Sequence, residues 1–398
     1  MKIAITGMGI ISSIGNTVEE NYEALLSKKA GISQIQNIET LHKEAIKVGE
    51  IKLNNKELST MLGLSEDNNF SRTAMLGAYA AKKAIENAAI FDLNEYKTGL
   101  ISATSVGGMD MTERYYYEYF KNPTLQKYIE THDAGNSSHK IADYIGLKGF
   151  VSTVSTACSS AANAIMLGAR MIASGQLDRV IVGGTDALSK FTINGFKTLM
   201  ILSDTYNTPF DDERKGLNLG EAAAFIVLES DRMITKTNKK VLAYLTGFGN
   251  ANDAYHQTAS SENGEGAFLA MQKAFEKATI TPDKIDYINV HGTATPNNDL
   301  SEGRAIIRAF EGYAKIPEFS STKAFTGHTL AAAAAIEAVY SILALQNNKV
   351  FPNLNFKTPM KEFDLIPQIE VLDKEINYVL SNSFGFGGNC STLIFSKK

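Results

Sequence analysis

Short apolar runs alternate with longer Ala-rich runs along this chain, and this alternation limits the fold more than any other feature. Strands are predicted at Ile3–Ile5, Gly99–Ala103, Arg179–Gly184, Val241–Leu245 and Thr392–Phe395, with an edge strand at Ala222–Glu229. Helices are predicted from Ser71, after Cys158, at about 266–278 and at Ala331–Leu345. Strands that alternate with helices are typical of α/β proteins, in which helices cover parallel sheets.

A charged stretch between Glu229 and Lys240 separates two halves, and we expect domains at 1–238 and 239–398. The two halves show no repeat that can be scored from the sequence. With 398 residues, 44% of them hydrophobic and 21% charged, the composition is that of a soluble globular protein.

Charge and cysteine content exclude several classes of protein. A net charge of −4 argues against a nucleic-acid partner, because phosphate binding needs a basic surface. Two cysteines, Cys158 and Cys390, provide no disulfide framework and indicate a reducing cytoplasm. The amino terminus lacks the apolar core of a signal peptide. No apolar stretch approaches the ~18 residues that span a bilayer, so we expect no membrane partner.

Cys158 follows a β-branched run, 150–156, and opens an Ala-rich helical stretch that ends at Gly175. A thiol at such a junction lies among unpaired backbone N–H groups and at the positive end of the helix dipole, which favour the thiolate. The pattern therefore indicates a catalytic nucleophile. The alternative is a small buried apolar residue at a helix start.

Two histidines, His291 and His328, share one pattern: a short apolar or β-branched strand is followed by a Gly/Thr loop that carries a His or Lys. Strand ends are where α/β folds place catalytic groups. Each histidine alone is more often structural than catalytic. Together with Cys158 they predict a Cys-His-His site.

Four blocks of the sequence, TACSS, VHGTATP, STKAFTGHTLAAA and NSFGFGG, resemble the active-site blocks of the β-ketoacyl-acyl-carrier-protein synthases, elongating condensing enzymes of the thiolase superfamily. The resemblance implies a thiolase-like duplicated αβαβα five-layer fold with mixed, mainly parallel sheets. It also implies a decarboxylating Claisen condensation in fatty-acid elongation or in a specialised polyene or polyketide pathway. No metal or cofactor is expected, because substrates are carried on the phosphopantetheine of an acyl-carrier protein. An acidic carrier would need a local Lys/Arg patch.

The chemistry of this reaction suits the three residues. Cys158 would hold the acyl chain as a thioester. Loss of carbon dioxide from a malonyl thioester gives an enolate, whose oxygen neutral imidazole N–H groups of His291 and His328 would stabilise. The resemblance implies an oxyanion hole made by the backbone N–H groups of Cys158 and Phe386.

Other residues match family positions individually. Lys323 is expected to be buried, with Glu302 as the carboxylate partner that a buried ammonium requires, and the pair would tune His328. The resemblance also implies a set of substrate-contacting residues, in which two threonines bind pantetheine and a glycine-flanked aromatic loop gates the acyl pocket. This set consists of Thr293, Thr295, Phe384, Gly385, Phe386 and Gly387, with Asp253 and His256 in a facing loop.

Some positions depart from the family pattern. Asn389-Cys390 stands where a Thr-Asn pair is more usual, and Ala331 and Ala334 replace glycines. The aromatic run Tyr115–Phe120 lies where family members line the acyl pocket and the dimer seam. Its other interpretation, which the residues alone favour, is an aromatic helix face packed in the core.

Two other functions and a dimer remain to be weighed. A thiolase-type acyl-CoA acetyltransferase would need a second cysteine as base, and Cys390 is the candidate. A chain-length-determining subunit of the same fold lacks the nucleophile, whereas Cys158 is present. We therefore expect a homodimer, or the active half of a heterodimer with a related chain-length factor. The interface is expected at Arg179–Gly184 or its flanking segments, because an unpaired apolar strand favours association.

Overall fold

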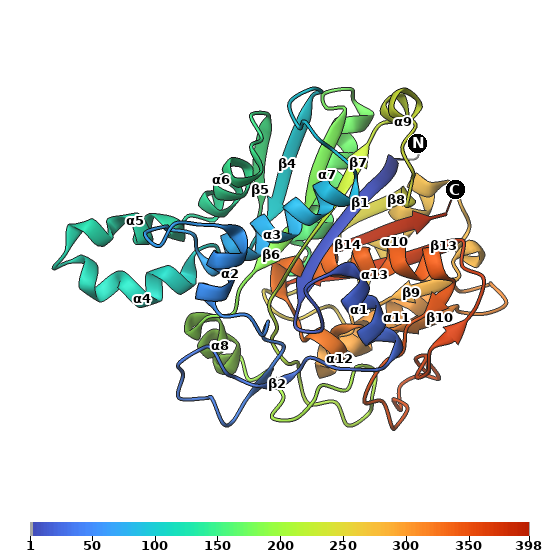
Figure 1. Ribbon diagram of the computed structural model, residues 1–398. Helices are drawn as coiled ribbons and strands as arrows, with labels where there is room; N and C mark the ends of the chain where they lie inside the picture. Colours follow the sequence, from blue (N-terminus) through green and yellow to red (C-terminus); the bar gives the residue numbers. More distant parts are fainter. Residues whose placement is uncertain (1–2, 398) are drawn as a thin grey trace.

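The computed structural model describes residues 3–397 and contains a ten-stranded mixed sheet (Figure 1). Its strands are β1 (Ile3–Ser12), β4 (Thr98–Ala103), β5 (Phe150–Val154), β6 (Arg179–Asp186), β7 (Ala222–Glu229), β8 (Ala243–Asn252), β9 (Tyr287–Asn289), β10 (Glu318–Ser320), β13 (Tyr378–Gly385) and β14 (Asn389–Ser396). Two short pairs lie outside it, β2 (Ser33–Gln34) with β3 (Lys47–Val48) and β11 (Lys349–Val350) with β12 (Leu372–Asp373).

Helices cover the outer faces of the two halves of this sheet and also lie between the halves. They are α1 (Val18–Leu26), α2 (Asn55–Leu62), α3 (Arg72–Asn87), α4 (Met109–Tyr119), α5 (Gln126–Ile129), α6 (Ala134–Ile145), α7 (Ser160–Ala173), α8 (Lys190–Thr198), α9 (Asp231–Thr237), α10 (Glu265–Ala278), α11 (Pro296–Ala309), α12 (Lys323–Thr326) and α13 (Ala333–Asn347). All strands and helices predicted from the sequence are present.

The sheet contains the same five-strand pattern twice. From the outside inwards, the order is β5-β4-β6-β7-β1 in the first half and β10-β9-β13-β14-β8 in the second. If the strands of each half are numbered along the chain, both orders read 3-2-4-5-1. The halves meet where β1 and β8 pair antiparallel, with Ile3 opposite Leu245. This confirms the duplicated architecture.

The two five-strand halves of the sheet form two layers, and three layers of helices complete the five-layer fold. α7 and α13 lie in the centre, where α7 packs on β4 and β6, and α13 packs on both β7 and β13. α3 and α6 cover the first half from outside, and α10 and α11 cover the second (Figure 1). The window Leu330–Asn347 is long and apolar enough to span a membrane, but 89% of it is buried inside the protein. Its apolarity is that of a core helix.

A short sequence repeat accompanies the structural duplication. Thr6-Gly7-Met8-Gly9 of β1 corresponds to Thr246-Gly247-Phe248-Gly249 of β8. A Cβ on Gly9 would lie 2.3 Å from the Ala80 carbonyl oxygen of α3, and one on Gly249 would lie 2.1 Å from the Ala270 carbonyl oxygen of α10. Glycine thus permits the same close helix-on-strand packing in both halves.

One prediction about sheet edges is wrong, and the unpaired strand expected at the dimer interface is paired, whereas the position of the interface itself stays a prediction. β7 is not an edge strand: it lies between β1 and β6, and every residue is buried because α3 and α13 cover its two faces. β6, the strand predicted at the dimer interface, is also internal, between β4 and β7. The edge on this side of the sheet is the flanking strand β5, where Phe150 is 40% exposed.

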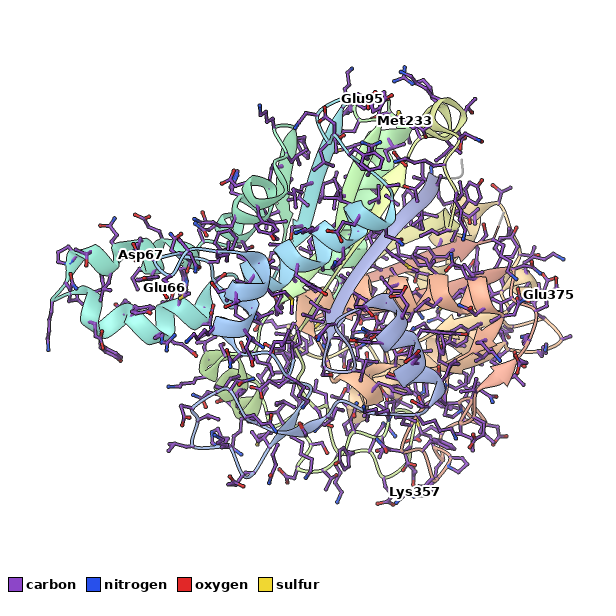
Figure 2. The ribbon with its side chains drawn as sticks, in the orientation of Figure 1. Glu66, Asp67, Glu95, Met233, Lys357 and Glu375 are labelled. Atoms are coloured by element: carbon purple, nitrogen blue, oxygen red, sulfur yellow. The ribbon has the colours of Figure 1, made fainter. Side chains whose placement is uncertain are left out.

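The aromatic run lies on α4, which projects from the body with α5 (Figure 1). Tyr115 stacks on Tyr128 at 4.3 Å between ring centroids, and Lys127 of α5 pairs with Asp67, which lies beside the projection in Figure 2. Tyr117 is 82% exposed and Phe120 is 66% exposed. The interpretation of this run as a core-facing helix side is therefore wrong.

Candidate active site

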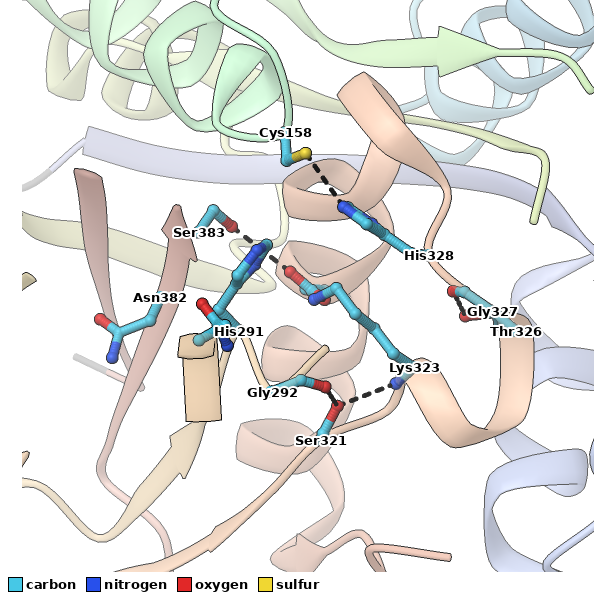
Figure 3. A network of polar contacts seen from close by, with 12 residues as sticks. Cys158, His291, Gly292, Ser321, Lys323, Thr326, Gly327, His328, Asn382 and Ser383 are labelled. Atoms are coloured by element: carbon cyan, nitrogen blue, oxygen red, sulfur yellow. Dashed lines mark hydrogen bonds and ion pairs between the residues drawn. The ribbon is translucent and has the colours of Figure 1, made fainter. Parts of the chain in front are cut away.

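Cys158, His291 and His328 converge at the centre of the molecule, where the two halves meet (Figure 3). Cys158 directly precedes α7, His291 follows β9, and His328 lies between α12 and α13. Sγ of Cys158 is 3.0 Å from Nε2 of His328. The two imidazole rings stand 5.4 Å apart at an angle of 87°. The thiol thus comes from the first half, and both histidines come from the second.

The turn that carries Cys158 has a constrained backbone. Ala157 has a φ of 52°, in the left-handed region that residues with a Cβ rarely adopt. The backbone N–H of Thr156 donates to Ser160 Oγ at 2.8 Å, and Ser159 Oγ donates to the Thr156 carbonyl at 2.8 Å. Such strain persists where surrounding contacts fix the conformation, and it is common at functional sites.

Burial controls the protonation of the thiol. It raises the pKa of Cys158 to about 12, although the positive charge of Lys323 and the backbone N–H groups of Phe386 and Cys158 oppose the rise. Desolvation therefore opposes the thiolate that the helix N-terminus was expected to favour. The resting group is a thiol, and the nearby His328 Nε2 is placed to receive its proton.

Both histidines are neutral in the folded protein. Burial, followed by the charge of Lys323, lowers the pKa of His291 and of His328 well below the ordinary value. Each Nδ1 is buried and has no hydrogen-bond partner among the described residues. Neutral imidazoles can donate an N–H to a developing oxyanion without transferring the proton first.

Lys323 is buried as expected, but its partner is different. Its ammonium pairs with Glu337 of α13, and Ser383 Oγ donates to the other oxygen of that carboxylate at 3.4 Å (Figure 3). The predicted pair with Glu302 is wrong. Glu337 was visible in the sequence as the one charged residue in the apolar run of α13, and a buried charge in such a run requires a partner.

Glu302 instead supports the backbone at His291. Its two oxygens accept the N–H groups of His291 and Gly292, each at 2.8 Å, and Asn382 Nδ2 donates to it at 3.2 Å. Burial raises the pKa of Glu302 to about 7, although these donors oppose the rise. Glu302 therefore fixes the loop that carries His291.

A cavity of about 310 Å³ opens onto the three central residues. Thr293 and Thr295 line it, with their hydroxyl oxygens 2.9 Å apart, and His256 lies on its wall. The other predicted contact residues that line it are Phe384, Gly385, Phe386 and Gly387. Asp253 is not among the lining residues, since its carboxylate accepts from Ser261 and from the Gly266 N–H at the start of α10.

A second cavity, of about 370 Å³, also reaches Cys158, and of its walls the sequence indicated only Cys158 and Phe386. Phe196 and Phe386 border both cavities, and their rings stack at 6.1 Å. The remaining walls are mainly apolar: Val106, Phe191, Leu199 and Leu330, with Ser105 and Thr192. This lining suits an acyl chain, and no motif in α8 distinguished its phenylalanines from core residues.

Comparisons with known proteins agree with this geometry. The models of the beta-ketoacyl synthase N-terminal and C-terminal domains match residues 1–233 and 242–357. The chain is 34% identical over 410 residues to 3-oxoacyl-[acyl-carrier-protein] synthase 2 of Staphylococcus aureus, covering all of this chain and 98% of the relative.

Two solved structures are similar over all of this chain. The ishigamide ketosynthase/chain length factor superposes with a TM-score of 0.93 at 27% identity, with 99% of that chain covered. The ketosynthase ApeO in complex with its chain length factor ApeC, from Xenorhabdus doucetiae, superposes with a TM-score of 0.86 at 29% identity, with 98% covered.

Fold and site together define a thiolase-like acyltransferase that joins acyl units by condensation. The chain belongs to the beta-ketoacyl synthase family. Enzymes of this family need no metal or cofactor beyond the phosphopantetheine that carries their substrates.

Proposed function

We propose that this enzyme condenses an acyl group held on Cys158 with malonyl-acyl-carrier protein, which gives 3-oxoacyl-acyl-carrier protein and carbon dioxide. The observation that carries the proposal is the 3.0 Å approach of Cys158 Sγ to His328 Nε2, with His291 beside them. The acyl chain occupies the apolar cavity, and pantetheine enters past Thr293 and Thr295.

In the loading step, the Cys158 thiol gives its proton to His328 as Sγ attacks the carbonyl carbon of the acyl thioester. The backbone N–H groups of Cys158 and Phe386 face Sγ and hold the oxyanion of the tetrahedral intermediate. The intermediate collapses, and the carrier thiol leaves with the proton from His328. A neutral resting histidine and a neutral thiol suit this exchange.

In the condensing step, the carbon–carbon bond to the malonyl carboxylate breaks and carbon dioxide leaves. The electron pair forms an enolate, whose oxygen accepts hydrogen bonds from His291 and from His328, the latter in the neutral tautomer that carries its proton on Nε2. The enolate carbon then attacks the acyl carbonyl, and the thiolate of Cys158 leaves and takes up a proton from solvent, which restores the resting thiol. Loss of one oxyanion donor in enzymes typically costs about 3–4 kcal/mol of transition-state stabilisation.

Replacing the nucleophile tests the proposal. Cys158→Ala should abolish ketoacyl product but leave decarboxylation of the malonyl carrier detectable, since the histidines do not need the thiol. Carbon dioxide and product are measured separately. Cys390→Ala is the matched control, because Cys390 also lines the cavity. Product from Cys158→Ala would refute the assignment, and loss of acetoacetyl-CoA cleavage in Cys390→Ala would favour the thiolase alternative.

The natural acyl chain belongs either to fatty-acid elongation or to a specialised polyene or polyketide pathway. The Staphylococcus aureus relative supports the first, and similarity to two ketosynthase/chain length factor structures supports the second. Mass spectrometry of the acyl group trapped on Cys158, after incubation with a panel of acyl-carrier proteins, separates the two.

We further propose a cytoplasmic dimer in which β5 replaces β6 as the interface strand. Three features support it: the open edge of β5, the exposed aromatic residues of α4, and Phe191, which lines the acyl cavity although it is 60% exposed. A partner would then complete the cavity wall. Sedimentation of the isolated chain decides: an active monomer refutes the dimer, and an inactive chain rescued by a related subunit favours a heterodimer.

The domain division at 238/239 likewise remains a prediction.

A further inference from the structure

A polar cluster lies beside the Cys158 turn and takes no part in the steps above. Oδ1 of Asn389 accepts hydrogen bonds from Asn163 Nδ2 at 2.8 Å and from Asn250 Nδ2 at 2.9 Å. Ser159 Oγ also lies 2.8 Å from this oxygen and shares its single proton between it and the Thr156 carbonyl. Ser159 and Asn163 belong to the first half of the fold, whereas Asn250 of β8 and Asn389 of β14 belong to the second. The cluster therefore ties the two halves together next to the nucleophile.

Asn163 extends the cluster to the strained part of the turn. Its Nδ2 also donates to Thr156 Oγ1 at 2.8 Å, and its Oδ1 accepts from Ser391 Oγ at 3.1 Å. Thr156 precedes Ala157, the residue with positive φ. A satisfied side-chain network of this kind restricts the conformation of the segments that it joins.

Asn389 stands at the foot of the Phe384–Gly388 loop, which packs on the same turn. A Cβ on Gly385 would lie 2.7 Å from the Thr156 carbonyl oxygen and 3.2 Å from the Cys158 nitrogen. Asparagine also differs from the threonine more usual at this position, because its acceptor oxygen lies one bond further from the backbone. The three donors converge on that more distant oxygen.

We propose that Asn389 is a positioning residue, whose carboxamide oxygen holds the Cys158 turn so that Sγ faces His328 and the N–H of Phe386 during acyl transfer. The inference rests on the nucleophilic role proposed for Cys158. The histidines are held by other contacts, such as Glu302 at the backbone of His291, so decarboxylation does not depend on Asn389.

The test compares two rates in the full-length protein. Loading of Cys158 is followed by mass spectrometry with hexanoyl-pantetheine thioester, and carbon dioxide release is followed with malonyl-pantetheine thioester. Asn389→Leu, which removes the acceptor, should slow loading about tenfold or more and change carbon dioxide release less than about twofold. Asn389→Asp keeps an acceptor oxygen and should load within about threefold of the parent. The matched control is Asn347→Leu, at an exposed asparagine that ends α13, and it should change neither rate.

Equal losses in both rates would show a general structural defect and overturn the inference, as would unchanged loading in Asn389→Leu or loading as slow in Asn389→Asp. If Asn389→Leu does not fold, Ser159→Ala removes one donor to Asn389 and should slow acyl loading more than carbon dioxide release, by a smaller factor than Asn389→Leu. Equal effects on the two rates in Ser159→Ala overturn the inference. A parent protein that is not acylated at Cys158 overturns the proposed function itself.

Discussion

Removing the carboxylate of Glu337 tests how the buried charges of the site are held. The side chains of Lys323 and Glu337 are 2% and 1% exposed, so water cannot replace a lost partner. Breaking a buried pair by removing one member typically costs about 3–5 kcal/mol, because an uncompensated charge remains in the interior. Glu337→Leu should lower the free energy of unfolding by that amount. Ser383 Oγ, which donates to Glu337 in the parent, remains next to the substituted side chain.

The double variant Lys323→Met/Glu337→Leu separates stability from chemistry. With both charges gone, its stability should return to within about 1–2 kcal/mol of the parent, since apolar replacement of a buried pair is often neutral. Burial then raises the pKa of Cys158 without the opposing charge of Lys323. Acyl loading of Cys158 should therefore be slower in the double variant than in the parent, although the double variant is stably folded.

Urea unfolding measures the stability, and the pH dependence of Cys158 alkylation by iodoacetamide measures the thiol. Comparison of the parent, Lys323→Met, Glu337→Leu and the double variant gives the coupling free energy between Lys323 and Glu337. The reasoning is refuted if Glu337→Leu is as stable as the parent, or if the double variant is as unstable as Glu337→Leu.

Three more predictions concern the same centre. Burial lowers the pKa of both histidines in the folded protein, so the unfolded chain binds more protons below about pH 6.5. The free energy of unfolding should therefore fall as pH decreases below about 6.5, by about 1.4 kcal/mol per pH unit for each histidine. In urea titrations His291→Gln should reduce this pH slope by about one proton, and an unchanged slope contradicts the prediction. His291→Ala and His328→Ala should each slow decarboxylation by about 10²–10³, but His328→Ala should also slow loading, because its Nε2 is the group 3.0 Å from Cys158; equal loading in the two variants counts against the proton transfer. Gly385→Ala places a Cβ 2.7 Å from the Thr156 carbonyl, so acyl loading should slow while far-ultraviolet circular dichroism stays unchanged, and normal loading would show that the turn yields to the new methyl group.

The alternation of strands and helices was predictable where an element has a clear apolar pattern, whereas β13 and the helices α6, α8 and α11 were not predicted. The positions of strands within the sheet were not predictable either. β7 lies between β6, the preceding strand, and β1, which is far away in sequence, and local pattern does not report such pairing. The duplication left a trace in the paired Thr-Gly-x-Gly segments of β1 and β8. That trace is short, because only the close helix-on-strand contacts need the same residues in both halves.

The convergence of Cys158, His291 and His328 was predictable because cysteine and histidine next to strand ends are conspicuous. Their electrostatic setting was not predictable. The partner of Lys323 lies on a helix of the central layer, and the pKa of Cys158 is raised by desolvation, which depends on the whole packed structure. Phe191 and Phe196 of the second cavity were not predictable for a similar reason, since an aromatic residue that lines a cavity has the same local pattern as one in a core.

Because the thiol belongs to one half of the molecule and the imidazoles to the other, catalysis is sensitive to how the halves are aligned. A rigid-body slip of about 1 Å between two intact halves would leave secondary structure and most of the core unchanged, yet a misplacement of that size can cost about a hundredfold in rate. Mild denaturant should therefore inactivate this enzyme before it unfolds the chain, with turnover as the earliest sign of loosening across the middle of the molecule.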